Sequence, residues 1–166
     1  AAIFNIEKLN WMNGVYIRKL TVDDFVQRAG PFLMRVAPKE MELDTFREYI
    51  YKIVPLIKER VKRLDEVPDL IKFFFLGQLD YDPILLIAKD MTTESTIRAL
   101  EVSKQRLAKM EGFEAAGLEA PLRSLAEELQ LKTGQLFGSL RTAVSGETAT
   151  PPLFQMMAVL GRERCL

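Results

Sequence analysis

The chain has 166 residues, enough for one domain with a hydrophobic core or for two small domains. It contains no histidine and a single cysteine, Cys165, which excludes an internal disulfide and removes the commonest general base and metal ligand. Basic and acidic residues are equal in number, 23 of each, so a uniformly basic nucleic-acid-binding protein is also excluded.

These counts favour recognition over catalysis. Glu127 and Glu128 are neighbours on a predicted helix and do not face each other, so they form no catalytic pair. No apolar run approaches the roughly 20 residues of a transmembrane helix, and we expect no membrane partner. A lone thiol fits a reducing cytosol, so we expect a cytoplasmic location. We predict no catalytic residue and no metal site.

The first part of the chain predicts short helices with clear breakers. Residues 6–20 fit a helix or a helix pair bent at 13–14, where an asparagine precedes a glycine. Thr21 begins a sequence that resembles a capping box and opens a helix over 22–29. The Gly-Pro pair at 30–31 is expected to break this helix.

A long helix is predicted from Asp44 onward. Its apolar residues recur three and four positions apart over about five turns, which is typical of one buried face. Pro55 lies inside this stretch, so we expect a kink or a break near residues 52–54. The stretch ends in a basic helical segment, 58–63, in which Glu59 and Arg63 can pair. The apolar stripe consists of Phe46, Ile50, Ile53, Ile57, Val61 and Leu64.

The second part of the chain follows a connector over 77–83 that is rich in helix-breaking residues and is the predicted domain boundary. Thr92 or Thr93 caps a helix that extends to Met110, with Ile97, Leu100 and Leu107 facing inward. A leucine-rich helix follows over 118–129, and another runs over 135–144 until Gly146 ends it. No strand is predicted.

The most informative pattern lies in the last twenty residues. Thr150 can cap a helix whose first turn accepts Pro151, because a proline there gives up only an unpaired N–H group. The other backbone donors of that turn would then face outward, beside a hydroxyl group, two prolines and Leu153. Such a corner suits a flat polar ligand, for example an unstacked base.

Five sequence blocks occur in series along nearly the whole chain: Phe4–Arg18, Leu131–Gln135, Leu140–Gly146, Thr150–Phe154 and Leu160–Arg164. In order and spacing they resemble the C-terminal anticodon-binding region of bacterial glutamyl-tRNA synthetases, which are class I enzymes. The resemblance implies an all-α fold, a two-part helical cage that grips the anticodon stem-loop. Residues 1–20 would be a connector from the stem-contact region, and 21–80 and 81–166 the two helical subdomains.

The resemblance also implies what this chain lacks. It contains no ATP-binding signature of the family, so we expect a non-catalytic module whose parent protein is a glutamate-tRNA ligase. ATP and Mg²⁺ are expected in the missing N-terminal catalytic half, and no cofactor in this chain. The implied partners are glutamate tRNA and that catalytic half, in a monomeric protein.

Arg60 matches the family's arginine that faces the third anticodon base. A guanidinium group has donors only, and cytosine presents acceptors on its Watson–Crick edge. The glutamine anticodon ends in guanine, whose hydrogen-bond donors would face the donors of the arginine. The unpaired donors would weaken binding by roughly 1–3 kcal/mol. Arginine at this position thus implies an enzyme restricted to glutamate tRNA. Without the resemblance, the favoured interpretation of Arg60 is a solvated helix residue with no contact to RNA.

The resemblance implies anticodon-loop contacts, to phosphate or base, for a further group of residues: Arg123, Lys132, Gln135, Arg141, Thr150, Pro151, Leu153 and Phe154. Leu153 is expected to pack on a base face. Ala149 replaces a frequent acidic residue, and Gly138-Ser139 a step that usually contains proline. From the residues alone, Arg141 can instead lie over the core, and Phe154 within it.

Two alternatives to this function stay open. One is a relaxed synthetase that also charges glutamine tRNA. The other is a helical protein-interaction module that keeps the fold and makes no RNA contact.

Overall fold

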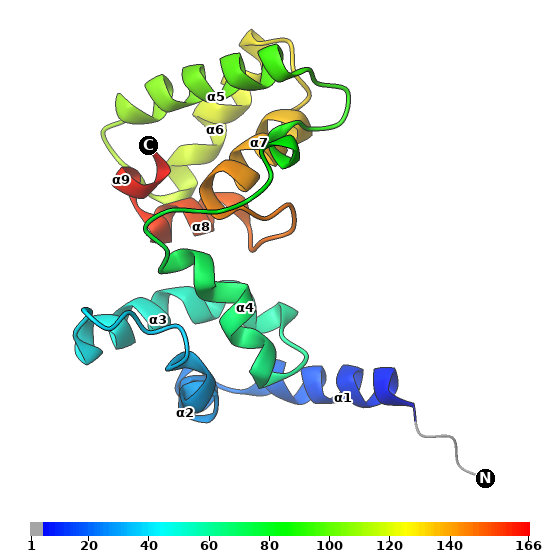
Figure 1. Ribbon diagram of the computed structural model, residues 1–166, viewed down its shortest axis with the longest axis vertical. Coiled ribbons are helices and arrows are strands. Elements are labelled where there is room, and N and C mark those ends of the chain that lie inside the picture. The colour runs from blue at the N-terminus through cyan, green and yellow to red at the C-terminus, as the bar shows by residue number, and fades with distance from the viewer. Residues whose placement is uncertain (1–4) are drawn as a thin grey trace. The chain divides into compact units, whose positions relative to one another are not determined.

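The computed structural model describes residues 5–166, and these are helical almost throughout, with no strand among them (Figure 1). The predicted all-α fold is therefore confirmed. Residues 1–4, the start of the expected connector, lie outside the described residues. None of the described helices combines the length and hydropathy needed to cross a bilayer. The chain divides into two compact units, Ala1–Leu76 and Gly77–Leu166, and the predicted connector begins where the second unit begins.

The described part of the first unit contains four α-helices and three short 3₁₀ turns. Its described helices are α1 (Ile6–Lys19), α2 (Val22–Leu33), α3 (Leu43–Ile57) and α4 (Val67–Ile71), with 3₁₀ turns η1 (Lys58–Arg60), η2 (Leu64–Glu66) and η3 (Lys72–Phe74). Thr21 caps α2 as predicted, because its side chain accepts a hydrogen bond of 3.1 Å from the Asp24 amide.

Two predicted helix breaks do not occur. The α2 helix continues through Pro31 to Leu33, and α3 continues through Pro55 to Ile57. Each proline removes one backbone bond, but the buried faces on both sides hold the helices in register. The α1 helix likewise passes Gly14 as one helix. These faces comprise Phe25, Ala29 and Leu33 in α2 and Ile53, Val54 and Ile57 in α3, all at most 3% exposed.

The predicted five-turn helix is shorter than expected. It starts at Leu43 with Glu42 at the N-cap, and it turns into the 3₁₀ turn η1 at residue 58. Val61 then adopts an extended conformation, with φ −74° and ψ 124°. Val61 still lies in the core although the helix ends earlier, so the apolar stripe was predicted correctly as far as Val61, whereas Leu64 is only partly buried.

The second unit contains 3₁₀ turn η4 and five α-helices: η4 (Pro83–Leu86), α5 (Thr93–Ala108), α6 (Ala115–Glu128), α7 (Thr133–Ser145), α8 (Leu153–Leu160) and α9 (Arg162–Cys165). The leucine face of α6 is buried as predicted: Leu118, Leu122 and Leu125 are 0% exposed. Thr92 caps α5 through the Ser95 amide at 3.2 Å.

The inward face of α5 was predicted only in part. Leu107 is buried, but Ile97 is 52% exposed. The core side of α5 instead carries Thr96 and Ser103, whose hydroxyl groups donate to the Thr92 carbonyl (2.8 Å) and the Ala99 carbonyl (2.6 Å). Because these hydroxyls are satisfied within their own helix, they can be buried at little cost.

Gly146 ends α7 as predicted and has a left-handed backbone, φ 74°. A Cβ at this position would lie 3.1 Å from Cδ1 of Tyr81. We therefore expect Gly146→Ala to lower the free energy of unfolding by about 1–2 kcal/mol. Gly134→Ala is the matched control, since its Cβ meets nothing within 4 Å. Urea denaturation checks this, and equal stability of the two variants would contradict it.

Candidate nucleic-acid interface

The turn between α7 and α8 is organised by Arg141 rather than by a helix cap. Its Nη1 donates to Oγ1 of Thr150 at 2.6 Å, to the Pro151 carbonyl at 2.8 Å and to the Thr150 carbonyl at 3.4 Å. Thr150 is only 7% exposed, so its polar groups need such partners inside the protein. Arg141 therefore bridges α7 to the two residues that lead toward α8.

The predicted cap at Thr150 is wrong. The α8 helix begins at Leu153 with Pro152 at the N-cap, and no side chain caps it. The Thr150 hydroxyl instead accepts from Arg141 and donates to the Pro151 carbonyl at 3.1 Å. The unpaired backbone N–H donors of the first turn of α8 thus start at residue 153, whereas the predicted helix starts two positions earlier.

The start of the turn is held by Ser145. Its hydroxyl lies 2.7 Å from the Arg141 carbonyl and accepts from the Glu147 amide at 3.1 Å. Gly146 donates to the Thr142 carbonyl at 2.7 Å. Both ends of the turn over 146–152, which we call the α7–α8 turn, are therefore fixed by hydrogen bonds inside the second unit.

Leu153 does not present its side chain at the surface. It is 4% exposed and belongs to the core of the second unit, as Met156 and Met157 do. The predicted packing of Leu153 on a base face therefore disagrees with this geometry. Pro152, which the sequence reasoning did not single out, is the exposed residue of this corner, whereas Pro151 is buried.

An aromatic and cationic cluster joins α6, α7 and α8. The Arg123 guanidinium lies 5.6 Å from the ring centroid of Phe137, and Phe137 meets Phe154 edge to face with centroids 5.0 Å apart. Arg123 also pairs with Glu119 at 2.6 Å, and its side chain is 54% exposed. Phe137 was missed from the sequence, although it lies one helical turn before Arg141 on the same face of α7.

Gln135 secures the start of α7. Its Oε1 accepts from the Lys132 amide at 2.8 Å, and its Nε2 donates to the Lys89 carbonyl at 2.9 Å. Both ends of this side-chain amide are therefore engaged within the protein. Lys132 is exposed at the N-cap position of α7.

Arg60 is the one predicted site residue in the first unit; the other eight lie in the second. It is exposed at the end of η1. The predicted pairing of Glu59 with Arg63 does not form, because the chain is extended between them at Val61. Arg63 instead bonds to Asp65 and holds the pKa of that carboxyl below its usual range. That Arg60 and the α7–α8 turn contact the same RNA stays a prediction.

The sequence matches the family model of the anticodon binding domain over residues 24–166. The chain belongs to this family. Among curated relatives, the glutamate–tRNA ligase of Dehalococcoides mccartyi is 49% identical over 166 residues, 100% of this chain and 34% of the relative. That of Roseiflexus castenholzii is 47% identical over 170 residues, with 99% and 33% covered. This anticodon-binding domain thus spans about a third of the length of the curated relatives it matches.

Solved structures agree with the fold. A glutamate tRNA ligase from Elizabethkingia meningosepticum matches with a TM-score of 0.79 and 22% identity, over 99% of this chain and 31% of that protein. A glutamate-tRNA synthetase from Elizabethkingia anophelis matches with a TM-score of 0.73 and 21% identity, again over 99% and 31%. At these identities the likeness shows a shared fold, the predicted helical anticodon-binding architecture.

Proposed function

We propose that this chain is the module of a glutamate–tRNA ligase that binds the anticodon loop of glutamate tRNA. The observation that carries the proposal is the 49% identity to the Dehalococcoides enzyme across the full length of this chain. The wider protein would join glutamate to its tRNA, with ATP and Mg²⁺ bound in a catalytic half that precedes this module. The module itself would be non-catalytic, and the protein monomeric and cytoplasmic.

The second unit has the two kinds of group that recognition of an anticodon loop needs, namely cations for the phosphates and aromatic surfaces for the bases. Arg123 and Lys132 are exposed cations, suited to phosphates of the loop. Phe137, beside the Arg123 guanidinium, and Phe154, which contacts Phe137, are partly exposed rings, and unstacked bases associate with such surfaces. A chain without net charge can bind RNA in this way because the cations are placed locally.

The first unit would supply specificity through Arg60. A guanidinium group accepts no hydrogen bond, so it favours cytosine over guanine at the third anticodon position. This favours a ligase restricted to glutamate tRNA over one that also charges glutamine tRNA. The remaining rival, a protein-interaction module without RNA contact, differs in its response to salt.

A titration over a salt series tests the binding function. The RNA is a hairpin that carries the glutamate anticodon loop, and the readout is the dissociation constant with this chain. With the two phosphate contacts assigned to Arg123 and Lys132, raising monovalent salt from about 100 to 200 mM should weaken binding about threefold, because counterions are released. A hairpin with the same stem and a four-nucleotide loop is the control. Absent or salt-independent binding would favour the interaction module.

A further inference from the structure

The segment on the N-terminal side of Arg60 is tethered through the side chain of Lys58. The Lys58 ammonium donates to the Leu20 carbonyl at 2.8 Å, which ties η1 to the end of α1. On the other side of Arg60, Val61 is 0% exposed and occupies the core. The Arg60 side chain is exposed, but the backbone that carries it therefore has little conformational freedom.

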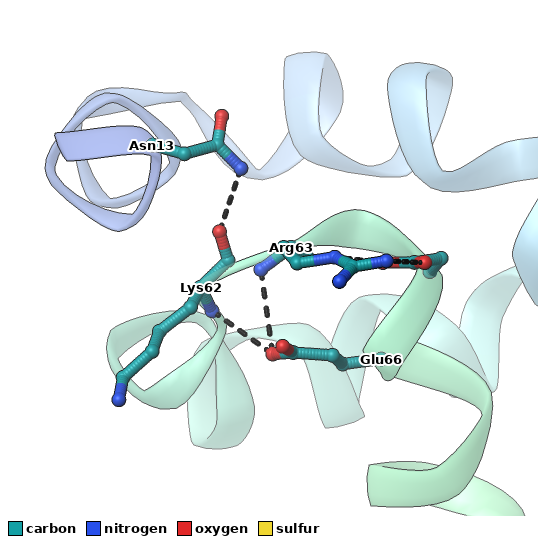
Figure 2. A network of polar contacts seen from close by, with 5 residues as sticks. Asn13, Lys62, Arg63 and Glu66 are labelled. Atoms are coloured by element: carbon teal, nitrogen blue, oxygen red, sulfur yellow. Dashed lines mark hydrogen bonds and ion pairs between the residues drawn. The ribbon is translucent and has the colours of Figure 1, made fainter. Parts of the chain in front are cut away.

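The two residues after Val61 are held from two directions (Figure 2). From α1, Asn13 Nδ2 donates to the Lys62 carbonyl at 2.6 Å. From η2, one carboxylate oxygen of Glu66 accepts from the amides of Lys62 and Arg63, both at 3.3 Å. We call Asn13 and Glu66 together the 62–63 bracket. It binds backbone groups only, so it fixes the path of the chain and not any one side chain.

The bracket depends on close approach of α1. A Cβ at Gly14 would lie 3.4 Å from the Val61 carbonyl oxygen and 3.5 Å from Cα of Lys62. At these distances an added Cβ would make ordinary van der Waals contact with the segment, so α1 lies against it here, and the neighbouring Asn13 amide is within reach of Lys62. The α1 helix is not divided into two at Asn13-Gly14, and this pair instead contacts the segment after Arg60.

We propose that Asn13 and Glu66 are positioning residues for Arg60. By holding Lys62 and Arg63 they set the direction in which the Arg60 side chain leaves the backbone, and so the preference for a cytosine at the third anticodon position. Directional hydrogen bonds of a guanidinium group require its supporting residues to be held within a fraction of an ångström. This inference rests on the proposed function and extends it to two residues that touch no RNA.

The test compares two hairpin RNAs that differ only in the third anticodon base, cytosine or guanine. The readout is the ratio of their dissociation constants with this chain. A ratio of about tenfold is expected for the unmodified chain. Asn13→Ala and Glu66→Ala should each lower the ratio at least threefold, while Glu66→Gln, which keeps an acceptor oxygen, should largely restore it. Glu59→Ala removes the same charge nearby and should leave the ratio unchanged.

The ratio separates positioning from a loss of folded protein, because a smaller folded fraction weakens both complexes equally. In the Arg60→Ala background, Glu66→Ala should have no further effect on the ratio. If the unmodified chain prefers cytosine and both bracket variants keep that preference, the inference is overturned and the proposed function stands. If the unmodified chain shows no preference for cytosine over guanine, the proposed role of Arg60 is wrong, and the positioning role of Asn13 and Glu66 is wrong as well.

Discussion

Arg60→Gln is expected to abolish the preference of this chain for a cytosine at the third anticodon position. A glutamine side-chain amide both donates and accepts, so it can pair with guanine as well as with cytosine, whereas arginine only donates. The lost discrimination corresponds to roughly 1–3 kcal/mol. Dissociation constants for hairpins with either base measure it. In the full-length ligase, the ratio of glutamate-tRNA to glutamine-tRNA charging should fall by a similar factor.

Arg60→Lys is the control for charge. Lysine keeps the attraction to phosphates but lacks the planar fork of the guanidinium group, so overall affinity should persist while discrimination weakens. An unchanged ratio in Arg60→Gln would show that Arg60 does not read the third base. Discrimination would then have to come from another residue.

The second large effect is expected from Arg141→Ala. This change removes a charged donor from three acceptors in the α7–α8 turn, one of them the hydroxyl of Thr150, which is 7% exposed. Hydrogen bonds to charged groups contribute about 1.5–3 kcal/mol, so the free energy of unfolding should fall by about 2–3 kcal/mol. Urea denaturation measures the loss, and amide hydrogen exchange should increase in residues 146–150, since the two prolines that follow have no amide hydrogen. RNA affinity should fall because the turn is no longer ordered before binding.

Arg123→Ala is the matched control for Arg141→Ala. Arg123 is a surface arginine whose ion pair, with Glu119, is exposed on both sides, so its loss should cost under about 1 kcal/mol of stability. It should nevertheless weaken RNA binding and reduce the salt dependence of binding, because the proposed contact of Arg123 with a loop phosphate is lost. A stable Arg141→Ala variant with unchanged exchange in the turn would contradict the organising role of Arg141.

Local signals predicted the helix ends well where the partner lies within one turn. Thr21 and Thr92 cap α2 and α5 through amides three residues ahead, and Gly146 ends α7 with a left-handed backbone. These interactions involve neighbours in the chain, so composition and spacing are sufficient to predict them. The connector at 77–83 is a local signal of the same kind.

Local signals failed where a distant contact competes with them. Pro31 and Pro55 are breakers by local preference, yet the helices continue because their buried faces are held by other helices. Thr150 is a good capping residue, but its hydroxyl group accepts a hydrogen bond from Arg141 instead of from a backbone amide of α8. Ile97 has helical spacing suited to burial, and the packing of α5 turns Thr96 inward instead.

By itself, the sequence was sufficient to predict the helical class, the family and the absence of histidine-based chemistry, since these depend on composition, periodicity and ordered blocks. Which side chains are presented to a ligand was decided by tertiary structure: Leu153 is buried, Pro152 is exposed, and Phe137 lies between Arg123 and Phe154. The physical reason is that burial and long-range hydrogen bonds depend on residues far apart in the chain. No local pattern could have joined Asn13 to Lys62, 49 positions away.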